Sequence, residues 1–271
     1  MKQHRPIQLI AGLAIVAMVA IVFREGSQAR SEVAVAPAGR PVVLELFTSQ
    51  GCSSCPPADA FLSSLRASGS PGVIPLAFHV DYWNHSGWTD PFSSRDWSVR
   101  QSDYSRAMGL DGEYTPQAII NGSYQCVGSD RGNIARAIAS ARSKPATARL
   151  ELGKLRYDDS AHTLTVKVKA ELTHAADHPV PVMVALYENG LVTKIGAGEN
   201  SGRQIVYDYT VRQLSEAFEV GPVAGKPLSR DIKLDLNPSW NTQQLGITVF
   251  VQDPASLHIG DAVAEYPVAK N

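Results

Sequence analysis

Two cysteines in the stretch FTSQGCSSCPPAD are the residues best suited to chemistry. Cys52 and Cys55 are separated by two serines and are followed directly by two prolines. A thiolate is both a nucleophile and a metal ligand, and a second thiol one helical turn away can attack a mixed disulfide. The pattern therefore indicates a redox centre, part of a metal site or a structural disulfide.

The elements around the pair favour redox chemistry. The apolar run PVVLELF predicts a strand buried on both faces, which ends just before Cys52. Ser53 or Ser54 can cap a helix that tolerates prolines in its first turn and runs to about Ala67. The free N–H groups at such a helix start stabilise a thiolate and lower the pKa of a cysteine placed there. We expect Cys52 to be the attacking thiol and Cys55 the resolving thiol.

A metal site and an inert disulfide are the alternatives for this pair. Structural zinc takes four ligands, but the sequence has neither a second CxxC nor a paired histidine motif. Copper(I) would suit two thiolates, and His79 or His85 could join them. An inert disulfide closing so short a loop would remove little entropy from the unfolded chain. We therefore predict no metal and no dissociable cofactor.

The order of elements predicts an α/β layer followed by a β-rich region. After the first strand and helix come a strand in GVIPLAFHV, a helix in DWSVRQSDYSRAMG, a hairpin in PQAIINGSYQCVG and a helix from Ser129 to about Ser143. Beyond SKPATARL the apolar residues alternate with polar ones, as in HTLTVKVKAEL, which is typical of a β-sandwich. We predict an α/β domain over residues 41–145 and an all-β sandwich over residues 146–271.

The first residues predict export. A basic start precedes an apolar run from Ile7 to Phe23, and the small residues Ser27 and Ala29 are spaced like those before a cleavage site. Residues 1–29 are thus a signal peptide or an uncleaved membrane anchor, and residues 30–40 a linker. Either alternative places the remainder in the periplasm or outside the cell, free or held at the inner membrane. The net charge of −1 gives no reason to expect nucleic acid as a partner.

Over about residues 40–143 this order of elements resembles the thioredoxin fold. The resemblance implies that the Thr115-Pro116 bond is cis and lies beside CSSC, with Thr115 and Pro116 forming the platform on which an extended substrate pairs. It also places Glu45, in LELF, near a buried acid of that fold, which makes it a proton shuttle or a structural acid. Trp83 and Trp88 lie in a long aromatic insert that forms either a local mini-core or a substrate-binding rim.

Four longer stretches carry a more specific resemblance. They are LELFTSQGCSSCPPAD, HVDYWNHSGWTDPFSSR, YTPQAIING and GENSGRQ. Together they resemble a bacterial family of secreted, thioredoxin-like proteins known only as the domain-of-unknown-function family numbered twelve twenty-three. The resemblance implies the fold and export, but no substrate.

These observations favour an exported thiol–disulfide oxidoreductase that acts on exported proteins with thiols or disulfides. A non-catalytic thioredoxin-like binding module, or a copper(I)-binding protein, is the alternative. The third cysteine, Cys126, is expected opposite Gln117 in the Asn-Gly hairpin. Two strand spacings would separate it from the pair, which is too far for a disulfide. We expect a buried thiol bonded to neither Cys52 nor Cys55.

Overall fold

A computed structural model describes residue 1 and residues 40–69 and 72–268. Apart from Met1, the predicted signal peptide or anchor lies outside the described residues, and so does the predicted linker apart from Arg40. In the part of the chain that the structure describes, no helix has both the length and the apolar character to cross a membrane. The described residues from Arg40 onward belong to one unit.

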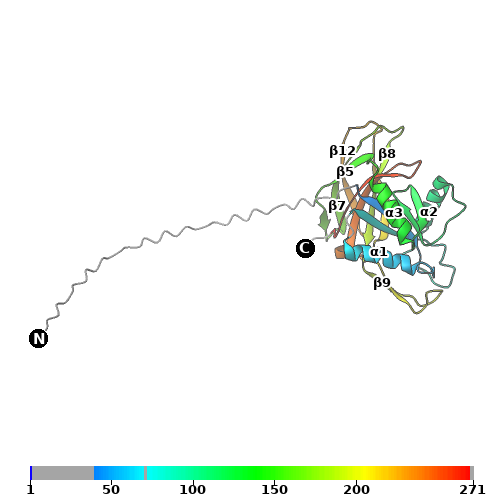
Figure 1. Cartoon of the computed structure of the whole chain (residues 1–271). Coiled ribbons are helices and arrows are strands. Elements are labelled where there is room, and N and C mark those ends of the chain that lie inside the picture. Colours follow the sequence, from blue (N-terminus) through cyan, green and yellow to red (C-terminus); the bar gives the residue numbers. More distant parts are fainter. Residues whose placement is uncertain (2–39, 70–71, 269–271) are drawn as a thin grey trace. The chain divides into compact units, whose positions relative to one another are not determined.

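The main element of this unit is a mixed sheet of eight strands (Figure 1). Its strands, in spatial order, are β14 (Ile259–Glu265), β13 (Leu245–Gln252), β8 (Val180–Glu188), β11 (Thr210–Val220), β2 (Val73–His79), β1 (Val42–Thr48), β3 (Gln117–Ile120) and β4 (Tyr124–Val127). The strands β1 and β2 are parallel, and β11 joins β2 in parallel where Thr210 pairs with Ala77. The sheet therefore unites strands from both halves of the chain.

This sheet shows that the predicted fold class is wrong. The chain does not form a thioredoxin-like α/β domain followed by an all-β sandwich, because strands β8, β11, β13 and β14 of the second half extend the sheet that β1 and β2 begin. An alternating pattern shows which face of a strand is buried, but it does not specify the neighbouring strand. The predicted boundary at residues 145/146 falls between the last α-helix and β5.

The other strands of the second half form two smaller sheets. One contains β12 (Leu228–Asp235), β7 (Thr163–Leu172) and β5 (Ala148–Leu152), with β6 (Arg156–Asp158) also pairing with β7. Its buried residues, such as Val166 and Val168, share a core with Val184 of β8 and Val249 of β13. The other is the pair β9 (Leu191–Lys194) and β10 (Gln204–Tyr207), whose connection reaches the cysteine pair. A short 3₁₀ helix, η1, spans Thr242–Gln244.

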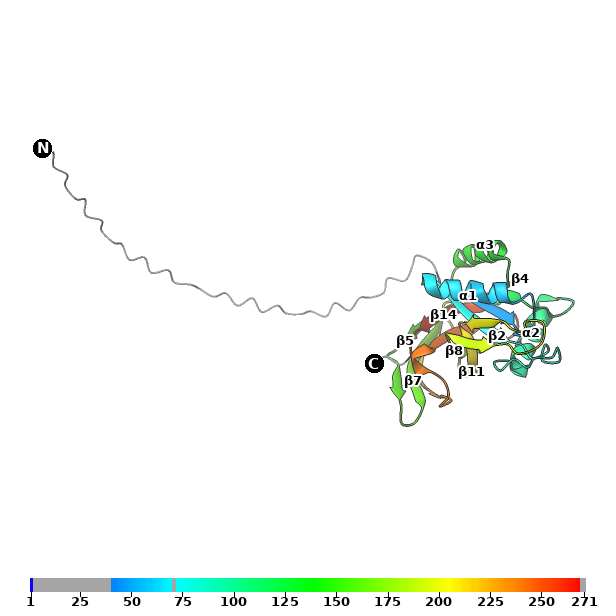
Figure 2. The ribbon, with the colours of Figure 1, turned by 90° about the horizontal axis from the view of Figure 1, so that it is seen from below.

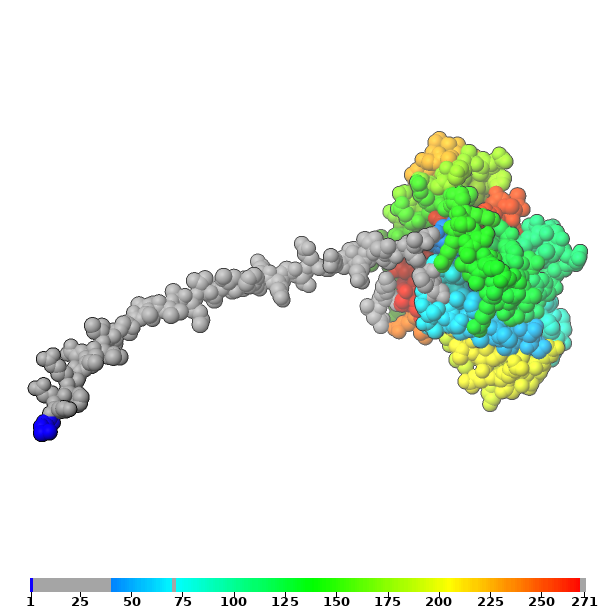
Figure 3. All heavy atoms as spheres, viewed as in Figure 1, coloured from blue at the N-terminus to red at the C-terminus, as the bar shows by residue number. Residues whose placement is uncertain are grey.

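Three α-helices cover β1 on both faces, which explains its continuous apolar run. The helices α1 (Pro56–Ser68) and α3 (Arg131–Arg142) pack against Leu44 and Leu46, whereas α2 (Arg95–Met108) packs on the side of Val43 and Phe47. Figure 2 shows α1 and α3 side by side, and Figure 3 shows their cyan and green surfaces meeting on one face. Every residue of β1 is buried as a result.

The Asn-Gly hairpin forms between β3 and β4, but with a different register from the predicted one. Asn121 and Gly122 have φ values of 46° and 65°, which suit these two residue types. Ser123 is a third loop residue, so Ala118 rather than Gln117 lies opposite Cys126. The predicted register is therefore wrong by one residue. The prediction for the thiol is confirmed: Cys126 is free and buried, and burial raises its pKa to about 11.

Candidate functional site

The cysteine pair lies where β1 ends and α1 begins. Cys52 and Cys55 form a disulfide, with their Cα atoms 5.5 Å apart, within the usual range. Cys55 is the N-cap of α1, and its carbonyl accepts hydrogen bonds from the backbone N–H groups of Ala58 and Asp59. The disulfide therefore lies at the positive end of the helix dipole.

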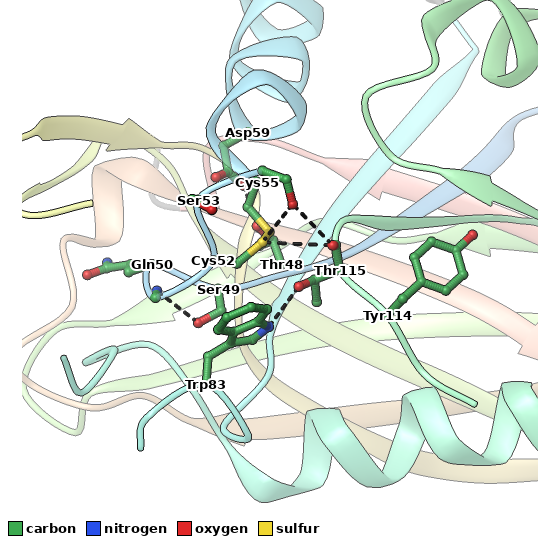
Figure 4. Close-up of a disulfide and its surroundings, with 12 residues drawn as sticks. Thr48, Ser49, Gln50, Cys52, Ser53, Cys55, Asp59, Trp83, Tyr114 and Thr115 are labelled. Carbon is green, nitrogen blue, oxygen red and sulfur yellow. Dashed lines mark hydrogen bonds between the residues drawn. A yellow bond between two sulfur atoms is a disulfide. The ribbon is translucent and has the colours of Figure 1, made fainter. Parts of the chain in front are cut away.

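The segment before β3 lies directly beside the disulfide. The Thr115-Pro116 peptide bond is cis, as predicted. The carbonyl oxygen of Thr115 lies 3.8 Å from the sulfur of Cys52 (Figure 4). It also accepts a hydrogen bond from the Ser54 hydroxyl at 3.4 Å. The predicted platform residues and the predicted thiol pair are thus neighbours.

The two predicted aromatic contact residues hold this region together. The indole N–H of Trp83 donates to the Thr115 hydroxyl at 2.8 Å (Figure 4). The Trp83 side chain also lies against Gly51, where an added Cβ would come within 3.1 Å of the Trp83 Cβ. The indole N–H of Trp88 donates to the Gln50 side chain at 3.0 Å. Both cysteines are 0% exposed to solvent, and the two indoles hold the segments on either side of them. Chemistry on Cys52 therefore requires this cover to move.

A connection from the second half of the chain also covers the cysteine loop. It joins β9 to β10 and contains the sequence GENSGR, for which the sequence suggested no chemistry. The amide of Asn200 donates to the carbonyls of Gln50 at 2.9 Å and Cys52 at 2.8 Å, and the Glu199 carboxylate accepts from the backbone N–H of Ser53 at 3.1 Å. Sequence analysis did not assign Glu199 and Asn200 to the site.

A buried polar cluster extends from α1 to β2. The Thr48 hydroxyl donates to one oxygen of Asp59 at 2.8 Å, and the His79 Nδ1 lies 2.7 Å from Asp90. The other oxygen of Asp59, the His79 Nε2 and the Tyr207 hydroxyl are buried without a hydrogen-bond partner among the described residues. Buried polar atoms without partners are uncommon in proteins, so this cluster is a candidate for proton exchange or ligand binding.

The charges in this cluster are coupled. Burial raises the pKa of Asp59 to about 7, although the charge of His79 opposes the shift. Burial also works against a charged His79, but the charge and hydrogen bond of Asp90 outweigh it and raise the pKa of His79. Asp59 lies one helical turn after Cys55, on the same side of α1. The carboxyl group is thus able to exchange protons near neutral pH within a turn of the disulfide.

Glu45, the predicted shuttle or structural acid, has a different neighbourhood. Its carboxylate is fully buried and pairs with Arg100 at 2.6 Å, while Arg100 also contacts Tyr104 and Gln252. Because a guanidinium holds the Glu45 carboxylate, Asp59 is the better placed of the two acids for proton transfer at the cysteine pair. No group of three or more histidines, cysteines, aspartates and glutamates is arranged to hold a metal within residues 40–69 and 72–268.

Comparisons with known proteins give a family match and two solved structures of similar fold. A family model described as "Protein of unknown function (DUF1223)" matches residues 43–252. The crystal structure of a protein from Agrobacterium tumefaciens is similar with 30% sequence identity and a TM-score of 0.61, over 83% of this chain and 94% of that one. HBP35 of Porphyromonas gingivalis is similar with 17% identity and a TM-score of 0.59, over 86% of this chain and 78% of that one, which shows likeness of fold alone. A comparison with curated proteins found no match.

Proposed function

Because the chain belongs to this family of proteins of unknown function, we propose its function from the site itself: it is a thiol–disulfide oxidoreductase that acts on other exported proteins. The observation that carries the proposal is the disulfide at the start of α1 with the Thr115 carbonyl beside Cys52. A helix start stabilises the thiolate that exchange requires. The proposed partners are periplasmic or secreted proteins with thiols or disulfides, and membrane contact is proposed only through the amino-terminal segment. We propose a relation to thioredoxin-like proteins only for the arrangement of the disulfide, the start of α1 and the neighbouring cis proline, and not for the whole fold.

The reaction is a two-electron exchange that needs no cofactor. In the reduced protein, the Cys52 thiolate attacks one sulfur of a substrate disulfide, whose S–S bond breaks and releases one substrate thiolate. Cys55 then loses its proton and attacks Cys52, which releases the second substrate thiolate and forms the Cys52–Cys55 disulfide. The substrate gains the two electrons that the cysteine pair loses, and the reverse sequence oxidises a substrate dithiol.

Asp59 accepts the proton of Cys55 in this proposal. It lies one turn from Cys55 on α1, it is buried, and the Thr48 hydroxyl donates to one of its oxygens. The second oxygen has no partner among the described residues and is free to bind a proton. A group whose pKa lies near the working pH is the best proton acceptor.

The test is catalysis of insulin reduction by dithiothreitol. We expect the wild-type chain and Cys126→Ser to catalyse the reaction, and Cys52→Ser to be inactive. Cys55→Ser should accumulate a mixed disulfide that a reducing agent dissolves, since the resolving thiol is absent. Equal rates for Cys52→Ser and the wild type would contradict the proposal.

The complete burial of both cysteines favours a second candidate, a non-catalytic binding module with a structural disulfide. The two functions differ in the response to glutathione. An oxidoreductase exchanges with glutathione without unfolding, whereas a structural disulfide exchanges only as fast as the chain unfolds. Reduction rates measured with and without a low urea concentration therefore separate the two candidates.

A further inference from the structure

A cavity lies at the opposite end of β1 from the disulfide. Ile120, which pairs with Leu44 near the start of β1, contributes to its wall, whereas Cys52 follows the other end of that strand. The cavity has a volume of about 270 Å³ and lies between the β3–β4 turn, the second half of α3 and the segment around His258. The thiol chemistry proposed above uses none of its residues.

The charge of this cavity is positive. Arg40, Arg136 and Lys144 line it together with His258, and neither aspartate nor glutamate is among the residues that surround it. Burial lowers the pKa of His258, and the positive charges of Arg40 and Lys144 add to this shift, although the hydrogen bond to the Asn121 carbonyl and the charge of Asp253 oppose it.

The most enclosed cation is held by carbonyl groups rather than by a carboxylate. Arg40 donates to the carbonyl oxygens of Pro145 at 3.1 Å and Ile259 at 2.6 Å. Its Nε is buried without a hydrogen-bond partner in the described part of the chain. Burial lowers the pKa of Arg40, although the negative charge of Asp261 opposes this shift. Asp261 does not line the cavity, and its carboxylate accepts a hydrogen bond from the backbone N–H of Leu150. An anion in the cavity would offset the cost of burying this guanidinium.

A buried amide adds a second unfilled donor. Asn121 is only 3% exposed, and its side-chain oxygen accepts a hydrogen bond from the backbone N–H of Val43 at 2.7 Å. Its Nδ2 has no partner among the residues that the structure describes. A buried N–H group without an acceptor destabilises the fold, and a ligand oxygen would satisfy it.

We propose that this cavity binds a small organic anion, a carboxylate with a compact apolar body. The carboxylate is recognised by the cations and by the Asn121 amide, and the body packs against apolar lining residues such as Ile120 and Ala137. The volume equals that of about nine molecules of liquid water, which suits a ligand of the size of benzoate. A guanidinium is the group best suited to hold a carboxylate through two hydrogen bonds.

The test is a titration of the full chain with sodium benzoate at low ionic strength, followed by calorimetry. We expect saturable binding with a dissociation constant of roughly 1 mM, since a ligand of so few atoms gains limited affinity. Benzamide, which has the same shape without the charge, should not bind. Arg136→Gln should weaken benzoate binding about fivefold, the upper range for a solvent-exposed ion pair.

Arg131→Gln is the matched control. Arg131 is also an exposed arginine of α3, but it lies over the Phe61 ring and does not line the cavity. Its removal should leave benzoate binding unchanged while changing the net charge by the same amount. Absence of benzoate binding, equal binding of benzamide, equal weakening by Arg131→Gln, or binding of inorganic phosphate in place of benzoate would each overturn the proposal.

Discussion

Replacing Asp59 by asparagine should remove a loss of stability that the wild-type protein suffers as the pH rises from about 4 to about 7. Asparagine keeps the shape of the side chain and the oxygen that accepts the Thr48 hydrogen bond. It removes the carboxyl group, whose pKa rises from 3.8 to about 7 on folding. Folding therefore disfavours the ionised form of Asp59, which predominates in the unfolded chain above pH 3.8.

The sign and size of the effect follow from proton binding. Between pH 3.8 and about 7 the unfolded chain has released this proton while the folded chain retains it. The unfolded state binds fewer protons, so Asp59 makes stability fall as pH rises across this interval. The full shift corresponds to about 4 kcal/mol, of which roughly 3 kcal/mol appears between pH 5 and pH 8. Below pH 3.8 the group is neutral in both states and has no effect.

The assay is urea denaturation of the oxidised protein at pH 5, 6, 7 and 8. We expect the free energy of unfolding of Asp59→Asn, minus that of the wild type, to increase by roughly 3 kcal/mol across this range. The charge of Asp59 also raises the pKa of His79, so the difference between the two proteins includes this coupling as well as the titration of Asp59 itself. Asp111→Asn, at an exposed position, is the control and should show a constant difference. A constant difference for Asp59→Asn would refute the reasoning about its burial.

Three further predictions concern the cysteines and their cover. Trp83→Ala should speed reduction of the disulfide by dithiothreitol several-fold without raising the unfolding rate, and an unchanged reduction rate would show that this side chain is not the barrier. Glu199→Gln removes the negative charge of a carboxylate that accepts a hydrogen bond from the backbone N–H of Ser53, near the start of α1. The Cys52 thiolate should then be more stable, which should raise the reduction potential measured against glutathione by roughly 6–20 mV. The control Glu219→Gln should leave the potential unchanged. Thiol titration of the denatured, oxidised monomer should find one free thiol, at Cys126, and any other number would contradict the disulfide assignment.

The elements that carry the cysteine pair could be predicted from the sequence because local signals specify them. An apolar run of strand length predicted β1, the two prolines and the CSSC stretch predicted the start of α1, and Asn121-Gly122 predicted the hairpin. The cis Thr115-Pro116 bond was implied by the family resemblance. These features depend on a few neighbouring residues each, and no distant strand decides them.

The sheet could not be predicted in the same way. The alternation after residue 145 correctly indicated strands, but the pairing of Thr210 with Ala77 joins positions far apart in sequence. The contacts that cover the cysteine pair could not be predicted either, since the Asn200 amide donates to the Cys52 carbonyl from a position 148 residues away in the sequence. The position of Asp59, in contrast, could have been predicted. A carboxylate four residues after a cysteine at a helix start lies on the same side of the helix, and the sequence shows this spacing between Cys55 and Asp59.

The corrected fold accounts for the closed state of the disulfide. β11 begins at Thr210, three residues after β10 ends at Tyr207, so its pairing with β2 positions the β9–β10 connection over the cysteine loop. The ion pair between Arg66 of α1 and Asp208, at 2.6 Å, fixes the intervening segment to the same helix that Cys55 caps. The second half of the chain is therefore part of the site, because its place in the sheet brings Glu199 and Asn200 to the cysteine pair. In the proposed exchange, access to Cys52 requires Trp83 or this connection to move, because Trp83 lies against Gly51 and Asn200 binds the carbonyls of Gln50 and Cys52.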